Sequence, residues 1–505
     1  MWTAIYGCTE YTFGLRKLIA IEIHEKTFSM YKSIFHFAIL IMFVSVGCSP
    51  ISTFESTPTA VPTQSIPTST VLPTLATPRL SETPLAPSIT VAPEVSTWLR
   101  ENAIPFDTTD PNSDFQDLMP LKELIGDARI VALGEATHGT HEFFEMKHRM
   151  LRFLVEEMGF NTLAFEANWP EANLVNDYVQ TGQGDPAELL RGLYWTSHTQ
   201  EVLDMIRWMR AHNENPGDTP LVSFFGFDMQ LYTIAMDNVV AYVEQVDADR
   251  AAQTTELYHC FRQYSNRELI YAHLSEETRT ACRANLQAVY DQVSQQQSNY
   301  EARSSSEEFE RALQNARIVL QAEHHYGAGD EGFMLRDRYM AENVAWRLDQ
   351  AGPSAKIVLW AHNFHISTFF ADSKPMGEYL RERYRDQMVV FGFSFYQGSF
   401  NAFQYLGDRR VDQKLTEFSV ALPPENSYEY TFRSAELPRF FLDLRGLPSD
   451  SPATNWLLTS HPFRHIGAGY DPTSPEDFFL SGILPDMFDV IIYFQDTSRS
   501  ILLNR

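Results

Sequence analysis

The sequence is poor in positive charge, in cysteine and in long hydrophobic runs. Its 505 residues hold 39 Lys and Arg against 65 Asp and Glu, a formal net charge of −26. Nucleic-acid binding needs clustered cations that neutralise phosphates, so this balance excludes a nucleic-acid partner. Four cysteines are too few for a disulfide-rich scaffold. The apolar share of 44% and the aromatic share of 13% predict a globular protein with a sizeable core.

Two common hydrolase motifs are also missing. A serine hydrolase usually carries G-x-S-x-G, and the nearest stretch, Gly392–Tyr396 (GFSFY), lacks the second glycine. A zinc protease helix reads H-E-x-x-H, and His141–Glu145 (HEFFE) lacks the second histidine.

The cysteines do not indicate a nucleophile. Cys8 and Cys48 lie in an N-terminal leader, whereas Cys260 and Cys282 lie in a polar middle region. The sequence leaves open whether Cys260 and Cys282 form a disulfide or remain free thiols.

The N-terminus contains a short apolar run, Ile34–Val46. At about 13 residues it is shorter than the roughly 20 that a membrane span needs, and it has the length of a signal-peptide core. A small residue and Cys48 follow, which resembles the bacterial lipoprotein cleavage box. We therefore expect residues 1–48 to be a leader, with Met30 as the true start and lipidated Cys48 as a membrane anchor. An uncleaved anchor is the alternative, and either way the protein is expected to be extracytoplasmic.

A linker is predicted at residues 49–94, which hold nine of the 27 prolines and many Ser and Thr residues. Proline fixes φ and removes a backbone donor, so such a segment stays extended and acts as a spacer. Its charged residues up to Pro93 are only Glu55, Arg79 and Glu82. The acidity therefore belongs to residues 95–505, which we expect to form the catalytic domain.

Short apolar runs bounded by polar residues recur in this domain, at 128–134, 161–166, 221–228, 356–363, 388–394 and 489–495. Strands that are apolar throughout indicate a sheet buried on both faces, and hence a parallel one. Helical patterns separate them, most clearly at Glu142–Met158, which Gly159 ends. The predicted fold class is α/β, with a mostly parallel central sheet flanked by helices.

Residues 231–348 differ from the rest of the domain, because strand signals vanish and long Gln-, Glu- and Arg-rich stretches appear. We expect a large helical insertion. The sequence does not decide between a cap over the sheet and a bundle packed to one side.

Polar residues follow the predicted strands. In an open parallel sheet, ligands bind beyond the carboxyl ends of the strands. Those ends carry Glu135, His138, Glu166, Asp228, His362 and His365. We expect these side chains to meet at one edge of the sheet and to form the functional site.

A His/Glu site of this kind can activate water directly. Histidine has an unperturbed pKa of about 6.5, and a positioned general base accelerates a reaction roughly 10²–10⁴-fold. The residue types also permit an alternative, a metal-dependent hydrolase with His138, His362 and His365 as ligands. A second alternative is a lipid-anchored protein that binds a ligand without turnover.

At these positions the chain resembles the erythromycin esterases. The likeness spans most of residues 100–400, with weaker likeness beyond. The matching segments are Val131–Glu135 with His138, Glu142–Phe144, Gly159–Phe160, Phe165–Glu166, Gly226–Asp228, Asp337–Val344 with Trp346, Ala361–Asn363 with His365, and Pro375–Gly377.

The resemblance implies a carboxylic ester hydrolase that needs no metal or other cofactor and cleaves macrolide lactones, a reaction of antibiotic resistance. It implies that His138 deprotonates water and that Glu135 and Glu166 hold this histidine and the water. His362 and His365 would stabilise the oxyanion.

The resemblance also places a basic residue on the helix after His138. This residue is Lys147 here, where some members carry Arg. On the same helix, His141 and His148 are expected to be surface residues. The substrate is expected to be a small-molecule ester or lactone, and the surplus of acidic residues is expected to keep the surface soluble.

Overall fold

The structure is a computed structural model that describes residues 91–503, with the exception of Asp408. The predicted leader, which includes Met30 and Cys48, lies outside the described residues. The predicted linker also lies outside them up to residue 90. At the linker's far end, helix α2 already begins at Pro93.

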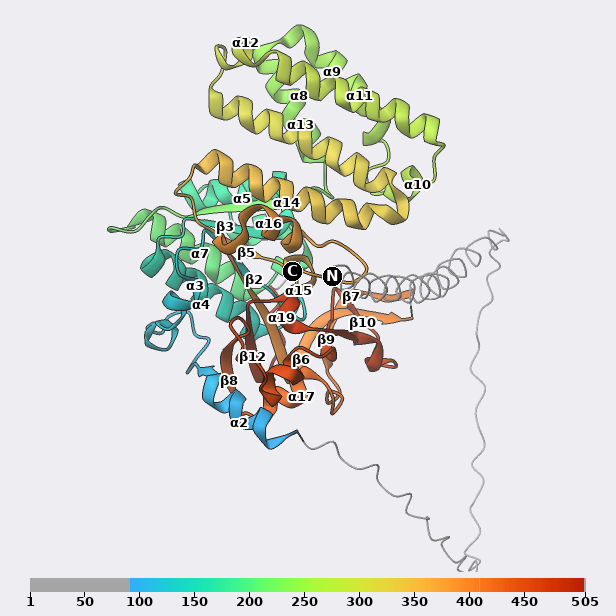
Figure 1. The fold of residues 1–505 in the computed structure, drawn as a ribbon. Helices are drawn as coiled ribbons and strands as arrows, with labels where there is room; N and C mark the ends of the chain where they lie inside the picture. Colours follow the sequence, from blue (N-terminus) through green and yellow to red (C-terminus); the bar gives the residue numbers. More distant parts are fainter. Residues whose placement is uncertain (1–90, 408, 504–505) are drawn as a thin grey trace, which may run out of the picture. The chain divides into compact units, whose positions relative to one another are not determined.

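The centre of the described chain is a ten-stranded sheet with the main order β1-β8-β12-β6-β2-β5-β3-β4, to which β7 and β10 add by pairing with β6 (Figure 1). The strands are β1 (Ile104–Pro105), β2 (Ile130–Leu133), β3 (Thr162–Asn168), β4 (Ser223–Asp228), β5 (Ile357–Trp360), β6 (Met388–Leu406), β7 (Arg409–Ser419), β8 (Arg439–Asp443), β10 (Gly469–Tyr470) and β12 (Val490–Thr497). All neighbours from β12 to β4 along this order run parallel. The predicted α/β fold with a mostly parallel sheet is confirmed.

The central strands are buried on both faces, as their apolar sequences require. Alternate residues face opposite sides, so Ile130 and Ala132 belong to one hydrophobic core while Val131 and Leu133 belong to the other. The register places Leu133 opposite Trp360. The carboxyl ends of β2 and β5 are therefore level, which brings the residues after them to one edge.

Three strands run antiparallel to their partners and were not expected: β8 beside β12, β1 beside β8, and β7 beside β6. Strand β6 is also longer than its predicted apolar run of 388–394. Beyond Gly398 it pairs with β7 instead of the central strands, so the demand for apolar residues on both faces ends there.

Helices cover both faces of the sheet. Before the insertion they are α2 (Pro93–Asn102), α3 (Leu121–Ile125), α4 (His141–Met158), α5 (Trp169–Thr181), α6 (Pro186–Arg191) and α7 (Gln200–Glu214), with short turns η2 (Gln116–Leu118) and η3 (Trp195–Ser197). Helix α4 ends as predicted at Gly159, whose φ of 72° closes the helix in the left-handed conformation that glycine adopts most readily.

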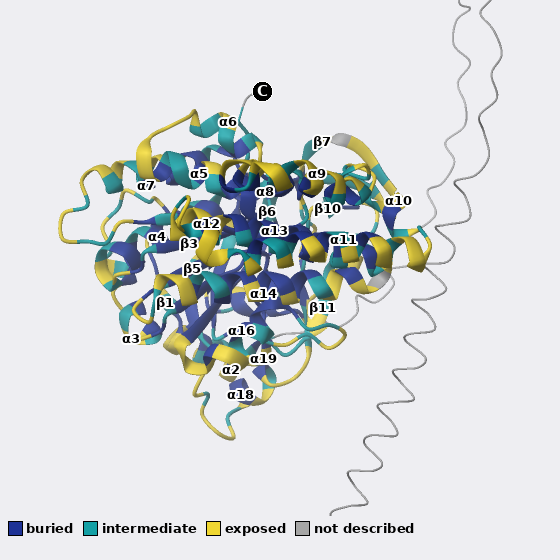
Figure 2. Ribbon diagram, turned by 90° about the horizontal axis from the view of Figure 1, so that it is seen from above, coloured by how far each residue is buried: buried dark blue, intermediate teal, exposed yellow. Residues whose placement is uncertain are grey.

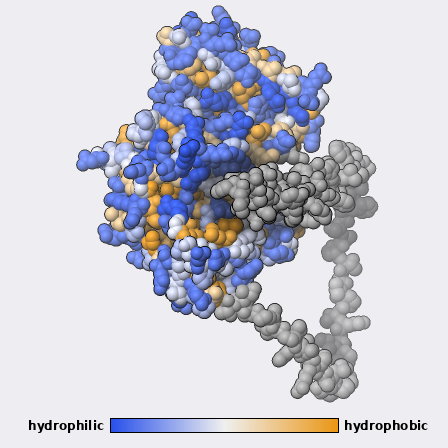
Figure 3. Space-filling view, viewed as in Figure 1, coloured by the Kyte–Doolittle hydropathy of each residue, from blue (hydrophilic) through white to orange (hydrophobic). Residues whose placement is uncertain are grey.

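Only helical elements lie between β4 and β5. They are α8 (Thr233–Val246), α9 (Ala248–Arg262), α10 (Glu268–Ala272), α11 (Glu276–Gln295), α12 (Gln297–Glu301), α13 (Ser306–Gly327), η4 (Gly329–Glu331) and α14 (Gly332–Ala351). A disulfide between Cys260 and Cys282 joins α9 to α11 and resolves the question that the sequence left open. The visible surface of this bundle is mostly hydrophilic (Figure 3).

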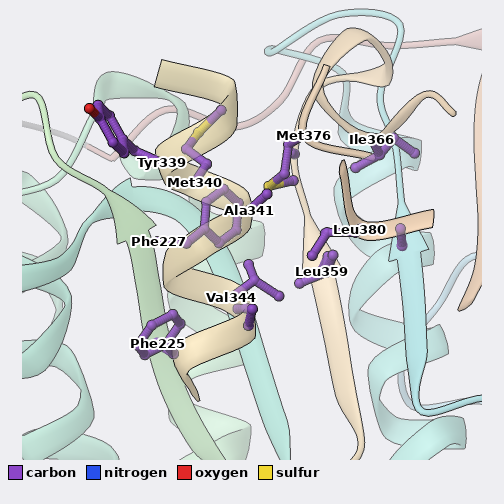
Figure 4. Packing of buried hydrophobic residues seen from close by; sticks show 14 of the residues in the cluster. Phe225, Phe227, Tyr339, Met340, Ala341, Val344, Leu359, Ile366, Met376 and Leu380 are labelled. Carbon is purple, nitrogen blue, oxygen red and sulfur yellow. The ribbon is translucent and has the colours of Figure 1, made fainter. Parts of the chain in front are cut away.

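Helix α14 connects the bundle to the sheet. It packs against α13 on one side and against β4 and α16 (Met376–Tyr384) on the other. Figure 4 shows Met340 and Val344 of α14 facing Phe227 and Phe225 of β4. This apolar contact fixes the middle of α14 relative to the sheet.

The remaining elements surround the C-terminal half of the sheet. They are α15 (Asn363–Ile366), η5 (Arg385–Gln387), α17 (Tyr428–Arg433), α18 (Pro452–Leu457), β9 (His461–Arg464), η6 (Pro475–Phe478), β11 (Phe479–Gly482) and α19 (Leu484–Met487). Strands β9 and β11 form a separate antiparallel pair. Buried residues concentrate on the central strands and exposed ones on the outer helix faces (Figure 2). Among the described residues, no helix is both long and apolar enough to cross a bilayer.

Candidate active site

The loop that follows β2 runs from Gly134 to Thr140 and is held closely on two sides. A Cβ at Gly134 would lie 2.1 Å from Oδ1 of Asn363, and a Cβ at Gly139 would lie 2.1 Å from the carbonyl oxygen of Asn401. Only glycine fits at either position. The two glycines therefore hold the loop against α15 and β6, and the loop carries Glu135 and His138 between them.

His138 is oriented by a carboxylate. Its Nδ1 lies 2.6 Å from Oε1 of Glu135. In the neutral ring, the Nδ1–H donates a hydrogen bond to Glu135, and Nε2 carries an unprotonated lone pair. No group among the described residues hydrogen-bonds this Nε2. The His138 side chain is 14% exposed, so Nε2 can accept a proton from a bound water.

Lys147 holds the other oxygen of Glu135. Its Nζ donates to Oε2 at 2.6 Å, and Nε1 of Trp360 donates to the same oxygen at 3.0 Å. The ammonium also lies 4.3 Å from the centre of the Trp360 ring, a cation–π distance. The predicted basic residue therefore acts on Glu135, and through Glu135 on His138.

Burial shapes the charges of this pair. Burial alone would raise the pKa of Glu135, but the charges of Lys147 and His138 outweigh it and hold the pKa below its usual range. Lys147 is fully buried, which lowers its pKa to about 8 although Glu135 opposes the shift. Both groups are charged near neutral pH, so the ion pair is intact there.

Glu166 lies near the carboxyl end of β3. Its Oε2 accepts the backbone N–H of His362 at 3.0 Å, and its Oε1 accepts from Nη2 of Arg336 at 2.8 Å. Burial acts to raise its pKa, but His365, Arg336 and His138 lower it to about 2. Glu166 is therefore a carboxylate at every physiological pH.

Arg336 is a site residue that the sequence did not reveal. It enters from the second turn of α14 and donates from Nε and Nη2 to the buried carboxylate of Asp228, with its shortest contact at 2.7 Å. Burial alone would raise the pKa of Asp228, but Arg336 holds it well below its usual range. Arg336 directly precedes the matching segment that begins at Asp337, and this was the one available signal.

His365 lies beside Arg336 with both ring nitrogens engaged. Its Nδ1 donates to Oδ1 of Asp337 at 2.8 Å, and its Nε2 accepts from Nη1 of Arg336 at 3.0 Å. Burial acts to lower its pKa, but Asp337 and Glu166 outweigh this effect and raise it. The ring therefore links α14 to the strand edge.

His362 occupies the predicted edge, but its geometry does not suit the expected oxyanion contact. Its Nε2 donates to the carbonyl of Ile466 at 3.1 Å, and its Nδ1 accepts the backbone N–H of Phe364 at 3.2 Å. Burial holds its pKa well below the usual value, so the ring is neutral. His362 and His365 thus offer no free N–H, because backbone groups engage the ring of His362 and two side chains engage that of His365.

His465 is a second residue that the sequence did not reveal. Its ring centre lies 4.7 Å from that of His362, which in turn lies 4.9 Å from that of His138. It directly follows β9 and is distant in sequence from the predicted strand ends. A histidine in an unremarkable loop gave no signal of its own.

The alternative metal site is not formed by these residues. In the part of the chain that the structure describes, no group of three or more His, Cys, Asp or Glu side chains converges as a metal ligand set. Of the three histidines considered, His362 and His365 direct their ring nitrogens at other protein groups.

Of the two histidines on α4, His148 is not a surface residue, whereas the side chain of His141 is 25% exposed. His148 is buried, and this burial lowers its pKa to about 3. His141 is paired with Glu201 at 2.5 Å and Glu145 at 3.3 Å, which raise its pKa to about 10. Neither is among the groups that contact His138, so both remain outside the site.

Comparisons with known proteins agree with this arrangement. A model of the erythromycin esterase family matches residues 155–497. Erythromycin esterase type II of Escherichia coli is 26% identical over 377 residues, which cover 70% of this chain and 89% of that protein. The putative hydrolase YbfO of Bacillus subtilis (strain 168) is 27% identical over 432 residues, 80% of this chain and 92% of that protein.

A solved structure is also similar. A Bacillus cereus protein superposes with a TM-score of 0.72 at 29% sequence identity, over 82% of this chain and 99% of that one. The match covers nearly the whole of the solved chain, so the sheet and its insertion belong to one shared fold.

Proposed function

This chain belongs to the erythromycin esterase family, and from that premise we propose that it hydrolyses a carboxylic ester or a macrocyclic lactone with water activated by His138. The family makes it a hydrolase. The bond cleaved, the mechanism and the independence from metal are the content of the proposal.

The observation that carries the proposal is the 2.6 Å contact between His138 and Glu135. It leaves Nε2 of His138 unprotonated and without a protein partner among the described residues. A carboxylate behind an imidazole fixes the tautomer and stabilises the imidazolium that forms when the ring takes a proton. Lys147 keeps Glu135 in place for this task.

The proposed reaction has two steps. In the first, Nε2 of His138 takes a proton from water as the water oxygen bonds to the ester carbon, and the carbonyl electron pair moves to the oxygen. In the second, the oxyanion re-forms the carbonyl and the C–O bond to the alcohol breaks. The His138 imidazolium returns its proton to the departing alkoxide.

The charges of the site favour this proton transfer. Glu135, Glu166 and Asp228 are three carboxylates, and the cations paired with them are only two, Lys147 and Arg336. His365 pairs with Asp337 and so adds no net positive charge, which leaves the group with an excess of negative charge. An imidazolium at His138 offsets part of this excess, so its formation is stabilised in a buried environment.

The test is hydrolysis of a panel of simple esters and macrocyclic lactones by the full chain. We expect His138→Ala and Glu135→Gln to lower kcat by about 10²–10⁴-fold, the contribution of a positioned base. His259→Ala is the matched control, because this histidine is exposed on α9 and should leave kcat unchanged. A wild type that is inert on the whole panel contradicts the function. An active wild type matched by His138→Ala contradicts the site.

Metal independence has a separate test. We expect full activity after prolonged treatment with a chelator and no gain from added Zn²⁺. Loss with the chelator and recovery with Zn²⁺ would instead favour the metal-dependent alternative.

We also propose that the protein is an extracytoplasmic lipoprotein anchored through Cys48. The leader sequence motivates this, and the Cys260–Cys282 disulfide supports it, because disulfides persist in oxidising compartments. Mass spectrometry of the mature N-terminus is the test. We expect a lipidated Cys48, and Cys48→Ala should release the protein from membranes while Ser49→Ala should not. An unmodified N-terminus at another residue would contradict the anchor.

A further inference from the structure

The segment that carries His465 is tied to both halves of the proposed site. The N–H of Ile466 donates to the carbonyl of Ala136 at 2.9 Å, in the loop that bears His138. The carbonyl of Ile466 accepts from Nε2 of His362 at 3.1 Å. The N–H of His465 itself donates to the carbonyl of Phe478 at 2.9 Å. His465 is thus held in register with the His138 loop.

The ring of His465 is placed by contacts that leave its nitrogens free. It lies edge-on to His362, with ring centres 4.7 Å apart. The ring centres of Phe364 and Phe370 lie 6.3 Å and 6.4 Å from its own. No described group hydrogen-bonds either ring nitrogen. The residue is partly exposed, and neither nitrogen is among the fully buried polar atoms that lack a partner.

The charge state of the ring follows from its surroundings. Burial, together with His365 and His138, lowers the pKa of His465 to about 4. At neutral pH the ring is therefore an imidazole with one N–H to donate. A neutral donor does not compete with His138 for a proton from water.

Resting on the proposed function, we propose that His465 is a further catalytic residue, which donates its N–H to the oxyanion that develops on the ester carbonyl. The neighbouring histidines and Lys147 are already committed. His362 and His365 have no free N–H, and Lys147 is fully buried against Glu135.

The spacing of the rings suits this role. The ring of His362 contacts both His138 and His465, at 4.9 Å and 4.7 Å between ring centres. The ring centres of His138 and His465 therefore lie at most about 9.6 Å apart, the sum of these two distances. A water and an ester carbonyl, held by hydrogen bonds of about 3 Å at either end, fit a separation of this order. One carbonyl can therefore receive the water from the His138 side and direct its oxygen at His465. No further reactant is needed, since the proton that His138 takes returns to the alcohol.

The test compares two substitutions of similar length. His465→Gln keeps an N–H donor and His465→Met removes it. We expect His465→Met to lower kcat by about 10²–10³-fold, the usual effect of losing one oxyanion donor, with KM within about threefold of wild type. His465→Gln should retain at least about tenfold more kcat than His465→Met. A phosphonate that mimics the tetrahedral intermediate of the best ester should lose affinity for His465→Met by about the same factor as kcat/KM.

His461→Met is the matched control. His461 lies on β9 in the same segment but hydrogen-bonds the carbonyl of Trp456 and stacks on its ring, away from His138. This variant should keep wild-type kcat. Equal kcat for His465→Met, His465→Gln and wild type would overturn the inference, and so would an equal loss in both variants. A wild type inert on every ester would instead overturn the proposed function itself.

Discussion

A lysine that no water reaches holds its proton weakly, and Lys147 is such a residue. Its pKa of about 8 lies close to the working range of an enzyme. Below this pH the ammonium donates to Glu135 and keeps the carboxylate aligned with His138. Above it the neutral amine no longer holds the carboxylate by charge.

We therefore predict that kcat/KM falls on the alkaline side with an apparent pKa near 8. Lys147→Arg should move this limb upward by at least one pH unit, because a guanidinium stays protonated. A pH–rate profile of both proteins on one ester measures the shift. An alkaline limb that stays in place in the Arg variant would mean that another group controls it.

Glu166 carries a prediction about stability. Its pKa of about 2 in the folded protein lies below the ordinary 4.5. A lowered carboxyl pKa stabilises the folded state above the ordinary value, and this contribution is lost as the pH falls from 4.5 to 2. The difference corresponds to about 3 kcal/mol.

We predict that Glu166→Gln is less stable than wild type at neutral pH and that the gap narrows by about 3 kcal/mol between pH 4.5 and 2. Urea unfolding at several pH values measures the gap. Glu214→Gln, at an exposed carboxylate of α7, is the control that should show no such narrowing. If the difference in unfolding free energy between wild type and Glu166→Gln did not depend on pH, the stabilisation by Glu166 would not be electrostatic.

At the level of residues, the sequence could indicate positions that parallel strands impose. Glu135 and Glu166 lie near one edge because the ends of β2, β5 and β3 are level. Arg336 and His465 were not predicted, because a helix turn and a loop bring them to that edge. Neither residue follows an apolar strand pattern that could have indicated its position. Which nitrogen of a histidine carries the proton is equally invisible in the sequence.

At the scale of elements, the segment after β12 supports the His138 loop. The N–H of Ser500 donates to the carbonyl of Gly139 at 2.9 Å, and the N–H of His141 donates to the carbonyl of Ser498 at 2.9 Å. The N–H of Ser498 donates to Glu142 at 2.7 Å. These bonds brace the loop where α4 begins.

Removal of residues 498–505 should lower kcat by about tenfold or more, because a loosened loop misplaces the base. The effect on KM should be smaller. Removal of 504–505 alone is the control and should leave kcat unchanged. Steady-state kinetics on one ester compares them, and wild-type kcat in the longer deletion would show that the bracing is dispensable.

The sequence predicted the elements unevenly. The strands from β2 to β5 and β12 are continuous apolar runs, which a sheet covered on both faces requires. Strand β7 lies at the margin of the sheet and pairs antiparallel, so a weaker apolar pattern suffices there. Strand β8 has a buried apolar centre, Phe440–Leu442, but it is only five residues long. The helical character of α8–α14 was readable from their polar periodicity, but the connection through α14 to Arg336 was not.

At the scale of the whole molecule, the helical bundle and the site share α14 but are stabilised differently. The disulfide closes a loop between positions that are 22 residues apart, and a cross-link of this length is worth about 3 kcal/mol. It lies in the bundle, away from His138.

We predict that Cys260→Ser with Cys282→Ser lowers the melting temperature and speeds proteolysis of the bundle, while kcat on a small ester stays within about twofold. Scanning calorimetry and limited proteolysis measure the first effect. Mild reduction of the wild type should reproduce it. A large loss of kcat would show that the bundle shapes the site directly.

The position of β12 has a consequence for biosynthesis. This strand follows every other strand in the chain, yet it inserts between β6 and β8 and leads into the segment that braces Gly139. While the ribosome still holds these residues, the sheet lacks the strand that joins β6 to β8, and the loop around Gly139 lacks its support. The sheet can therefore close only late in synthesis, after β12 has emerged.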